Sequence, residues 1–173
     1  MNNERKITYD IAYMEMAKAV STLSYAERSK VGCIIVTPQG QVIAQGYNGT
    51  PTGMDNCCET IEKILNEEDS NLYGHDIYEN KLITKREVLH AESNAITKCA
   101  KNGCGSTEGS TIYITLSPCF ECSKLIIQAG IKRIVYKEQY RLTDGLDLLN
   151  EVGIICEQLD IEKKKLIRYE PNK

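Results

Sequence analysis

The second half of the chain alternates short apolar strands with helices, and this alternation constrains the fold more than any other feature. Strands separated by helices of this length usually pair in parallel, with the helices packed on the sheet. Gly130 ends the first of the helices. The expected strands are 111–115, 133–136 and 153–156, and the expected helices are about 119–129 and 144–152.

The first half supplies two further helices and a hairpin. Residues 9–28 space their apolar side chains along one helical face and contain neither Gly nor Pro. Two apolar runs, 31–37 and 41–47, flank Pro38-Gln39-Gly40 and predict a hairpin. Residues 84–101 predict a second helix, with Thr84 as N-cap three residues before Glu87. The expected fold is an α/β protein, a three-layer α/β/α sandwich.

Residues 48–83 interrupt this pattern with turn-forming residues and an acidic run at 67–69. We expect one domain over 1–173, with an insertion at about 50–83 that is ordered in part at most and holds a short helical piece near 61–65. The charged tail after residue 160 predicts a strand end or a short helix.

Composition excludes several classes of protein. The 173 residues are 42% hydrophobic, which suits one domain with a real core. Lys and Arg total 21 against 24 Asp and Glu, so no broad positive field favours nucleic acid. No apolar run is long enough for a membrane span, and the polar N-terminus is unlike a signal peptide. We expect a soluble, cytoplasmic protein whose eight cysteines serve metal binding, catalysis or burial rather than disulfides.

Two short strings carry the chemistry: His90-Ala91-Glu92 and Pro118-Cys119-Phe120-Glu121-Cys122. One imidazole and two thiolates meet the tetrahedral preference of zinc and leave the fourth position for water. Zinc lowers the pKa of bound water towards ~7. Glu92 then has the chemistry to move protons between that water, a ring nitrogen and a leaving amine.

Each string alone has an ordinary interpretation. His90 is also consistent with a hydrogen-bonded histidine on a helix, and Glu92 with a residue on the solvent-exposed face of a helix. The two cysteines are also consistent with a redox-active pair. A structural zinc module is the non-enzymatic alternative, but it requires four protein ligands. The joint occurrence of both strings, each beside a predicted helix, favours a catalytic zinc site.

The pair matches the His-x-Glu and Pro-Cys-x-x-Cys signature of zinc nucleobase deaminases. Together with Gly46-Tyr47-Asn48-Gly49, His90-Ala91-Glu92-Ser93-Asn94-Ala95-Ile96, Thr115-Leu116-Ser117-Pro118-Cys119 and Ala129-Gly130-Ile131, it resembles the deoxycytidylate (dCMP) deaminases of the cytidine deaminase-like superfamily. The resemblance covers roughly 24–140. It implies a five-stranded mixed sheet of order 2-1-3-4-5 with strands 3–5 parallel.

The resemblance also implies a reaction. It is the hydrolytic deamination of dCMP to dUMP and ammonia through zinc-bound hydroxide, with Glu92 as proton carrier, which supplies dUMP for dTMP synthesis. The alternatives are other nucleobase deaminases that act on tRNA adenosine or on free deoxycytidine. A basic surface suited to tRNA is not expected from an acidic chain.

Substrate-binding residues follow from the same resemblance. Ser24 and Arg28 are expected at the 5′-phosphate, although Arg28 also fits an exposed helix-end cation. Asn48 and Asn94 are expected near the sugar. The remaining expected contacts are Thr115 and Ser117, through main-chain groups beside the base, and Tyr140, which closes the sugar or phosphate side.

The resemblance implies three further expectations, about a second metal site, effectors and assembly. Cys57, Cys58 and His75 could form a second, structural zinc site, but Ala26 stands where such relatives carry a fourth ligand. Effectors are expected near Gly46, Tyr47, Asn48 and Gly49, with dCTP activating and dTTP inhibiting, each accompanied by Mg²⁺. A homohexamer is the expected assembly. Cys33, Cys99, Cys104 and Cys156 are expected to be small core residues.

Overall fold

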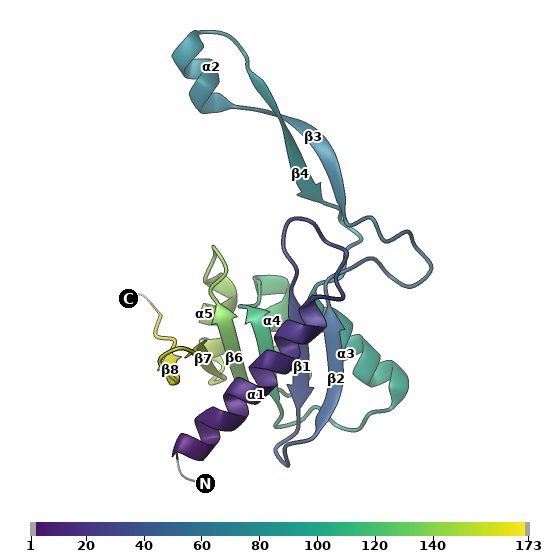
Figure 1. Ribbon diagram of the computed structural model, residues 1–173, viewed down its shortest axis with the longest axis vertical. Helices are drawn as coiled ribbons and strands as arrows, with labels where there is room; N and C mark the ends of the chain where they lie inside the picture. The colour runs from purple at the N-terminus through teal and green to yellow at the C-terminus, as the bar shows by residue number, and fades with distance from the viewer. Residues whose placement is uncertain (1–2, 172–173) are drawn as a thin grey trace.

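The computed structural model describes residues 3–171 as a six-stranded sheet flanked by helices, with a long hairpin projecting from one edge (Figure 1). Its helices are α1 (Asn3–Ser21), α2 (Glu67–Tyr73), α3 (Ala91–Asn102), α4 (Phe120–Gln128) and α5 (Asp144–Glu151). Its strands are β1 (Gly32–Val36), β2 (Val42–Tyr47), β3 (Glu59–Leu65), β4 (Tyr78–Thr84), β5 (Thr111–Leu116), β6 (Arg133–Glu138), β7 (Ile155–Asp160) and β8 (Lys165–Arg168).

The sheet has the order β2-β1-β5-β6-β7-β8. Strands β5, β6 and β7 are parallel, while β1 runs antiparallel to both β2 and β5. This confirms the mixed five-strand arrangement expected from the sequence. The charged tail adds β8 as a sixth strand, antiparallel to β7. Because β2 and β5 run in the same direction, their carboxyl ends meet at one edge of the sheet.

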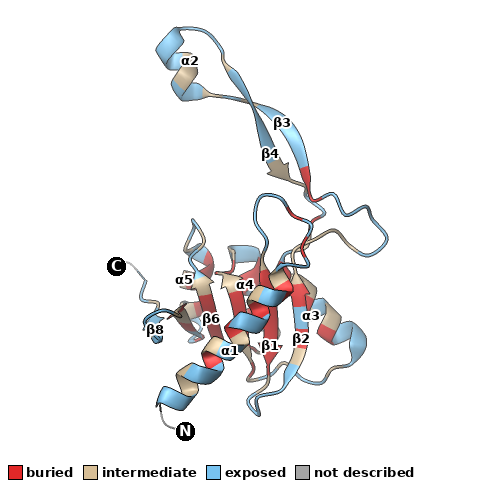
Figure 2. Cartoon of the chain, in the orientation of Figure 1, coloured by how far each residue is buried: buried red, intermediate tan, exposed pale blue. Residues whose placement is uncertain are grey.

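Helices cover both faces of the sheet. Helix α1 crosses one face, and α3, α4 and α5 cover the other (Figure 1). Side chains of β1 alternate between the layers: Ile34 and Val36 pack beneath α1, whereas Cys33 and Ile35 face α3. Buried residues therefore concentrate along the central strands (Figure 2). Within residues 3–171, no helix has both the length and the apolar character needed to cross a bilayer.

Helix α1 begins at Asn3, six residues before its expected start, and two other predicted helix boundaries are wrong for identifiable reasons. Helix α1 ends at Ser21 rather than near residue 28, because the Ser24 hydroxyl donates to the Asn48 carbonyl and accepts from the Ala26 N–H. Helix α3 begins at Ala91 rather than near residue 84. Thr84 ends β4 instead of capping a helix.

The insertion forms an ordered arm, which we define as residues 59–84. Strands β3 and β4 pair along their length, and α2 lies at the far end (Figure 1). The stretch 61–65, expected to be helical, is therefore strand. The helix starts six residues later than expected, at Glu67, where the Asn66 side chain accepts from the Asp69 N–H.

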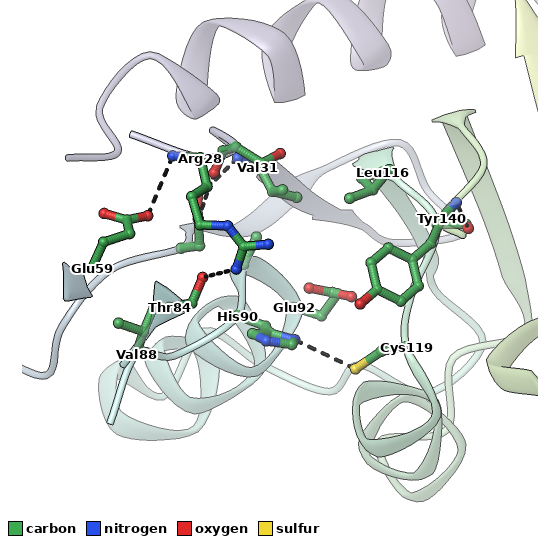
Figure 3. A pocket seen from close by; sticks show the side chains of 14 residues that line it. Arg28, Val31, Glu59, Thr84, Val88, His90, Glu92, Leu116, Cys119 and Tyr140 are labelled. Atoms are coloured by element: carbon green, nitrogen blue, oxygen red, sulfur yellow. Dashed lines mark hydrogen bonds between the residues drawn. The ribbon is translucent and has the colours of Figure 1, made fainter. Parts of the chain in front are cut away.

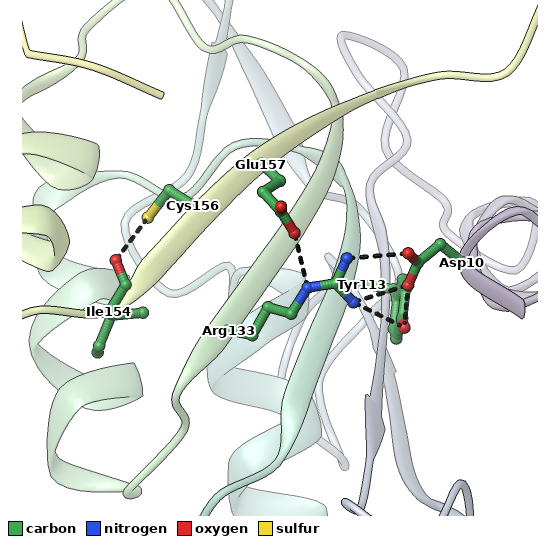
Figure 4. A network of polar contacts seen from close by, with 6 residues as sticks. All are labelled: Asp10, Tyr113, Arg133, Ile154, Cys156 and Glu157. Carbon is green, nitrogen blue, oxygen red and sulfur yellow. Dashed lines mark hydrogen bonds and ion pairs between the residues drawn. The ribbon is translucent and has the colours of Figure 1, made fainter. Parts of the chain in front are cut away.

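A buried ionic network fastens α1 to the sheet (Figure 4). The Arg133 guanidinium donates two bonds to the Asp10 carboxylate, at 2.7 and 2.9 Å, and a third to Glu157 at 2.7 Å. Tyr113 donates its hydroxyl to Asp10 at 2.6 Å. Burial, followed by the bond to Asp10, raises the pKa of Tyr113 far above its ordinary value. The network thus links α1, β5, β6 and β7.

Candidate active site

Two helices begin at the edge where β2 and β5 end. His90 is the N-cap residue of α3, and the bridge between Gly49 and Leu89 holds the approach to this helix against the end of β2. Cys119 is the N-cap residue of α4, which follows β5 directly. Cys122 lies in the first turn of α4 and is buried. The topology thus brings the two sequence strings together.

The three predicted ligands converge. His90 Nδ1 lies 3.4 Å from Cys119 Sγ and 3.4 Å from Cys122 Sγ. Tetrahedral zinc with ordinary Zn–N and Zn–S lengths separates a nitrogen and a sulfur by about 3.5 Å. Among residues 3–171, this is the only group of three or more Cys, His or acidic side chains suited to a metal ion. The donor set fits a catalytic zinc ion, and its three members leave a position for water.

Hydrogen bonding already favours thiolate at this cluster. A bond from Cys122, with a further one from His90, lowers the pKa of Cys119 to about 3. The shared proton correspondingly raises the pKa of Cys122. The pKa of His90 is raised chiefly by its hydrogen bond to Cys119. A cationic metal ion replaces that shared proton when the site is loaded.

Glu92 lies in the first turn of α3 and is only 3% exposed. Burial raises the pKa of its carboxyl group to about 7, while its own backbone hydrogen bond and His90 act in the opposite direction. A carboxyl group with a pKa in this range both accepts and returns a proton at neutral pH. The burial of Glu92 and its place in the first turn of α3, beside His90, therefore support it as a proton carrier.

A cavity of about 230 Å³ opens beside this cluster. Its inner end is lined by His90, Glu92 and Cys119, and its outer end by Arg28 (Figure 3). Apolar side chains form part of the walls between these ends, among them Val31. The cavity suits a flat ring at one end and an anionic group at the other.

Four of the expected substrate-binding residues line this cavity: Arg28, Asn48, Ser117 and Tyr140. The buried Ser117 hydroxyl accepts a hydrogen bond from the Tyr140 backbone N–H at 2.8 Å. This bond fixes the position of the Tyr140 main chain. Figure 3 shows the Tyr140 hydroxyl pointing into the cavity on the side of Glu92.

Asn48 stabilises the wall that it lines. Its Oδ1 accepts from the Val31 N–H and its Nδ2 donates to the Ser29 carbonyl, both at 2.8 Å. Each atom retains capacity for one more bond, because an amide oxygen accepts two and an NH₂ group donates two. Asn48 therefore orders the loop between α1 and β1, and any contact with substrate adds to that role.

Three other expected contacts lie outside the cavity lining. The Ser24 hydroxyl is buried against Asn48 and Ala26, so its role is in the loop. Thr115 accepts from the Gly32 N–H within the sheet. Asn94 donates to the Tyr47 carbonyl and faces a neighbouring cavity. In this structure the side chains of Ser24, Thr115 and Asn94 thus contact the protein main chain, and their predicted roles in substrate binding stay predictions.

The structure does not assemble the proposed second zinc site. Cys57 and Cys58 precede β3 at one end of the arm, whereas His75 follows α2 at the other end. The His75 ring contacts the Tyr73 carbonyl, and the exposed Cys57 thiol donates to the Glu59 carbonyl. Seven-residue strands hold the two ends apart.

A second cavity, of about 370 Å³, adjoins the segment where effectors were expected. Tyr47 and Gly49 line it, together with Thr50, Asn94 and Lys98. The Lys98 ammonium group lies 4.8 Å from the centre of the Tyr47 ring. Gly46 has a different role, because a Cβ there would overlap the Ala91 carbonyl oxygen where α3 packs on β2.

Sequence reasoning missed two lining residues, Glu59 and Thr84, which belong to the base of the arm. Glu59 is 8% exposed. Thr84 accepts a hydrogen bond from the Arg28 guanidinium at 3.0 Å. No short sequence motif includes either residue together with its hydrogen-bond partners, because those partners lie more than 30 positions away in the chain.

Comparisons with known proteins agree with this site. The family model described as "Cytidine and deoxycytidylate deaminase zinc-binding region" matches residues 7–138. The deoxycytidylate deaminase of Enterobacteria phage T4 is 36% identical over 178 residues, covering 88% of this chain and 90% of the relative. ComE operon protein 2 of Bacillus subtilis is 30% identical over 159 residues, covering 91% and 75%.

A solved structure shows the same relationship in three dimensions. The dCMP deaminase of cyanophage S-TIM5, crystallised in complex with dCMP and dUMP, superposes with a TM-score of 0.72. The two chains are 41% identical, and the match covers 92% of this chain and 99% of the other. These findings confirm the resemblance drawn from the sequence: the chain belongs to the cytidine and deoxycytidylate deaminase family.

Proposed function

We propose that this chain is a zinc-dependent hydrolase that converts dCMP and water into dUMP and ammonia. The observation that carries the proposal is one cavity that is lined at one end by the buried Glu92 and two members of the His-Cys-Cys donor set and at the other end by an arginine (Figure 3). The cyanophage relative that binds dCMP and dUMP supports the choice of substrate.

The residues divide the chemistry between them. Zinc held by His90, Cys119 and Cys122 would supply Lewis acidity and lower the pKa of a water molecule. Glu92 takes one proton from the attacking water and delivers it to ring nitrogen N3 as the water oxygen forms a bond to C4. It then carries the second proton to the amine at C4, which leaves as ammonia while the C4 carbonyl of uracil forms. Buried beside the donor set, Glu92 carries both protons inside the cavity.

The outer half of the cavity suits a nucleoside monophosphate. Arg28 offers the planar donor fork that binds a phosphate group. Asn48 also lines the cavity, and we propose that it contacts the deoxyribose. Tyr140 lines the cavity beside Glu92 (Figure 3). Specificity for dCMP over deoxycytidine therefore depends on Arg28.

Ammonia release measured in parallel on dCMP, deoxycytidine and an adenosine-containing tRNA anticodon stem tests this proposal. We expect dCMP to be turned over with the highest kcat/KM, and a zinc chelator to abolish activity until zinc is restored. Preference for deoxycytidine or for the tRNA would contradict the proposed substrate. Unchanged activity in the zinc-free protein would contradict the proposed chemistry.

We also propose that the second cavity is the effector site and that the protein is a homohexamer regulated by dCTP and dTTP with Mg²⁺. The buried Thr50 hydroxyl, which has no partner within residues 3–171, and Lys98 beside the Tyr47 ring support a polar, anionic ligand there. Saturation curves for dCMP should shift with dCTP and dTTP, and the shift should be lost in Lys98→Ala. A hyperbolic curve that neither nucleotide changes would contradict the regulation.

Light scattering after gel filtration tests the assembly, with an expected mass near six times 19.4 kDa. A monomer at the same concentration would contradict it. We place the reaction in the cytoplasm, or in a host's cytoplasm if a phage encodes the chain, where dUMP supplies dTMP synthesis. All eight thiols are free, which suits a reducing compartment.

A further inference from the structure

The base of the arm is packed against the body, whereas most of the arm is exposed. Strands β3 and β4 pack chiefly against each other, and no residue of α2 is buried. At the base, Cys58 and Glu59 are buried, and Cys58 forms a small apolar cluster with Ala26 and Val88. This cluster joins the arm to the loop between α1 and β1, residues 22–31.

Two residues that face each other across the base hold that loop. Glu59 and Thr84 are direct partners in the β3–β4 register. The Glu59 carboxylate accepts from the backbone N–H groups of Glu27 and Arg28, at 3.2 and 3.4 Å. The Thr84 hydroxyl accepts from the Arg28 guanidinium at 3.0 Å. The arm therefore contacts Arg28 through both its main chain and its side chain (Figure 3).

This double contact matters because Arg28 is otherwise exposed. A free arginine side chain samples many rotamers, and an anionic ligand must restrict them when it binds. One hydrogen bond to Thr84 uses one of the five guanidinium N–H groups and leaves four for a phosphate. The contact thus fixes the direction of the guanidinium group and leaves most of its donors for a ligand.

We infer that Glu59 and Thr84 are positioning residues that preorganise Arg28 for the 5′-phosphate, so that nucleotide affinity depends on the base of the arm. The inference rests on the proposed function, in which Arg28 binds that phosphate. Neither residue takes part in proton transfer, so the arm controls the binding of dCMP and leaves the chemical step unchanged.

Thr84→Val tests the side-chain contact, because valine keeps the shape and removes the acceptor. We expect the KM for dCMP to rise about tenfold, as for the loss of a hydrogen bond to a charged group, with kcat within twofold. Thr84→Ser keeps the hydroxyl and should restore the KM. A kcat that falls together with zinc content and melting temperature would show a merely structural role and overturn the inference.

Glu59→Gln tests the main-chain contact. A single amide oxygen replaces two carboxylate oxygens, and the new NH₂ group faces a backbone N–H donor. We again expect a higher KM for dCMP with kcat retained. Glu62→Gln is the matched control, since Glu62 lies three positions along the same strand with an exposed side chain. An equal change in both variants would overturn the role of Glu59.

A double-mutant cycle with Arg28→Met shows whether Thr84 acts through Arg28. The KM effect of Thr84→Val should disappear when methionine occupies position 28, and an effect that persists overturns the inference. If Arg28→Met lowers affinity for dCMP but Thr84→Val does not, only the role of the arm fails. If Arg28→Met itself leaves the KM for dCMP unchanged, the assignment of the phosphate site fails as well.

Discussion

At the scale of single residues, the site depends on a carboxyl group that is buried from bulk solvent. Glu92 is almost fully buried beside the donor set, and burial raises the pKa of its carboxyl group to about 7. It is not a member of the His-Cys-Cys group. Metal binding and proton transfer are therefore assigned to different side chains and are separable by substitution.

Glu92→Gln should lower kcat for dCMP by about 10²–10⁴-fold, the range typical for loss of a positioned acid–base group. The amide keeps the size of the side chain but cannot carry a proton. Zinc content should stay near one per chain, measured by atomic emission. Glu121→Gln, an exposed carboxylate on α4, should leave both quantities unchanged. Loss of zinc together with activity would instead assign a structural role to Glu92.

Single residues of the site differ in how far the sequence alone predicts their roles. The metal ligands and Glu92 were predictable because each string places its residues within one helix turn, as in His90-x-Glu92 and Cys119-x-x-Cys122. The role of Glu59 was not predictable from the sequence, because its hydrogen-bond partners Glu27 and Arg28 are 32 and 31 residues away in the chain. Chemistry confined to one helix start is visible in a single sequence, whereas contacts made by tertiary packing are not.

At the scale of elements, the distance between α3 and β2 sets the position of His90 and Glu92. Gly46 permits this close approach, since a Cβ would overlap the Ala91 carbonyl oxygen and lie 2.5 Å from the Ala95 nitrogen. Helix α3 must therefore move if residue 46 carries a side chain. Any movement reaches the metal site, because His90 directly precedes the helix.

Gly46→Ala should destabilise the fold by about 1–3 kcal/mol, the cost typical of overpacking, and should weaken zinc binding. Gly49→Ala is the control from the same segment, because its Cβ would meet only the Tyr47 ring at an ordinary 3.9 Å. Thermal unfolding and zinc titration of both variants measure the difference. Equal behaviour of the two alanine variants would refute the packing argument.

Element types were more predictable than element boundaries. Alternating strands and helices correctly predicted the parallel part of the sheet. The Thr84/Glu87 pair mimicked a capping box, yet Thr84 pairs with Glu59 across the arm instead. The Ile61–Leu65 stretch was short enough to suit helix or strand by periodicity, and pairing with β4 decides in favour of strand.

At the scale of the whole molecule, the network around Arg133 joins the α1 layer to the sheet at the end away from the active site. Asp10 is 1% exposed, and it connects α1 to β5 and β6 through Tyr113 and Arg133. Removing one partner from a buried ionic network is strongly destabilising, and without Asp10 the Arg133 guanidinium keeps only its ion pair with Glu157. Arg133 begins β6, whereas the metal ligands lie beyond the carboxyl ends of the strands.

Asp10→Ala should therefore lower the free energy of unfolding by about 3–5 kcal/mol while the folded fraction keeps its zinc and its KM for dCMP. In a chain of this length, each kcal/mol shifts the melting temperature by about 2–4 °C. Glu15→Ala breaks the exposed Lys18–Glu15 pair on the same helix and should cost at most about 1 kcal/mol. Equal melting temperatures for the two variants would mean that the network contributes no more than a surface pair. A raised KM in folded Asp10→Ala would mean that α1 transmits strain to the loop that carries Arg28.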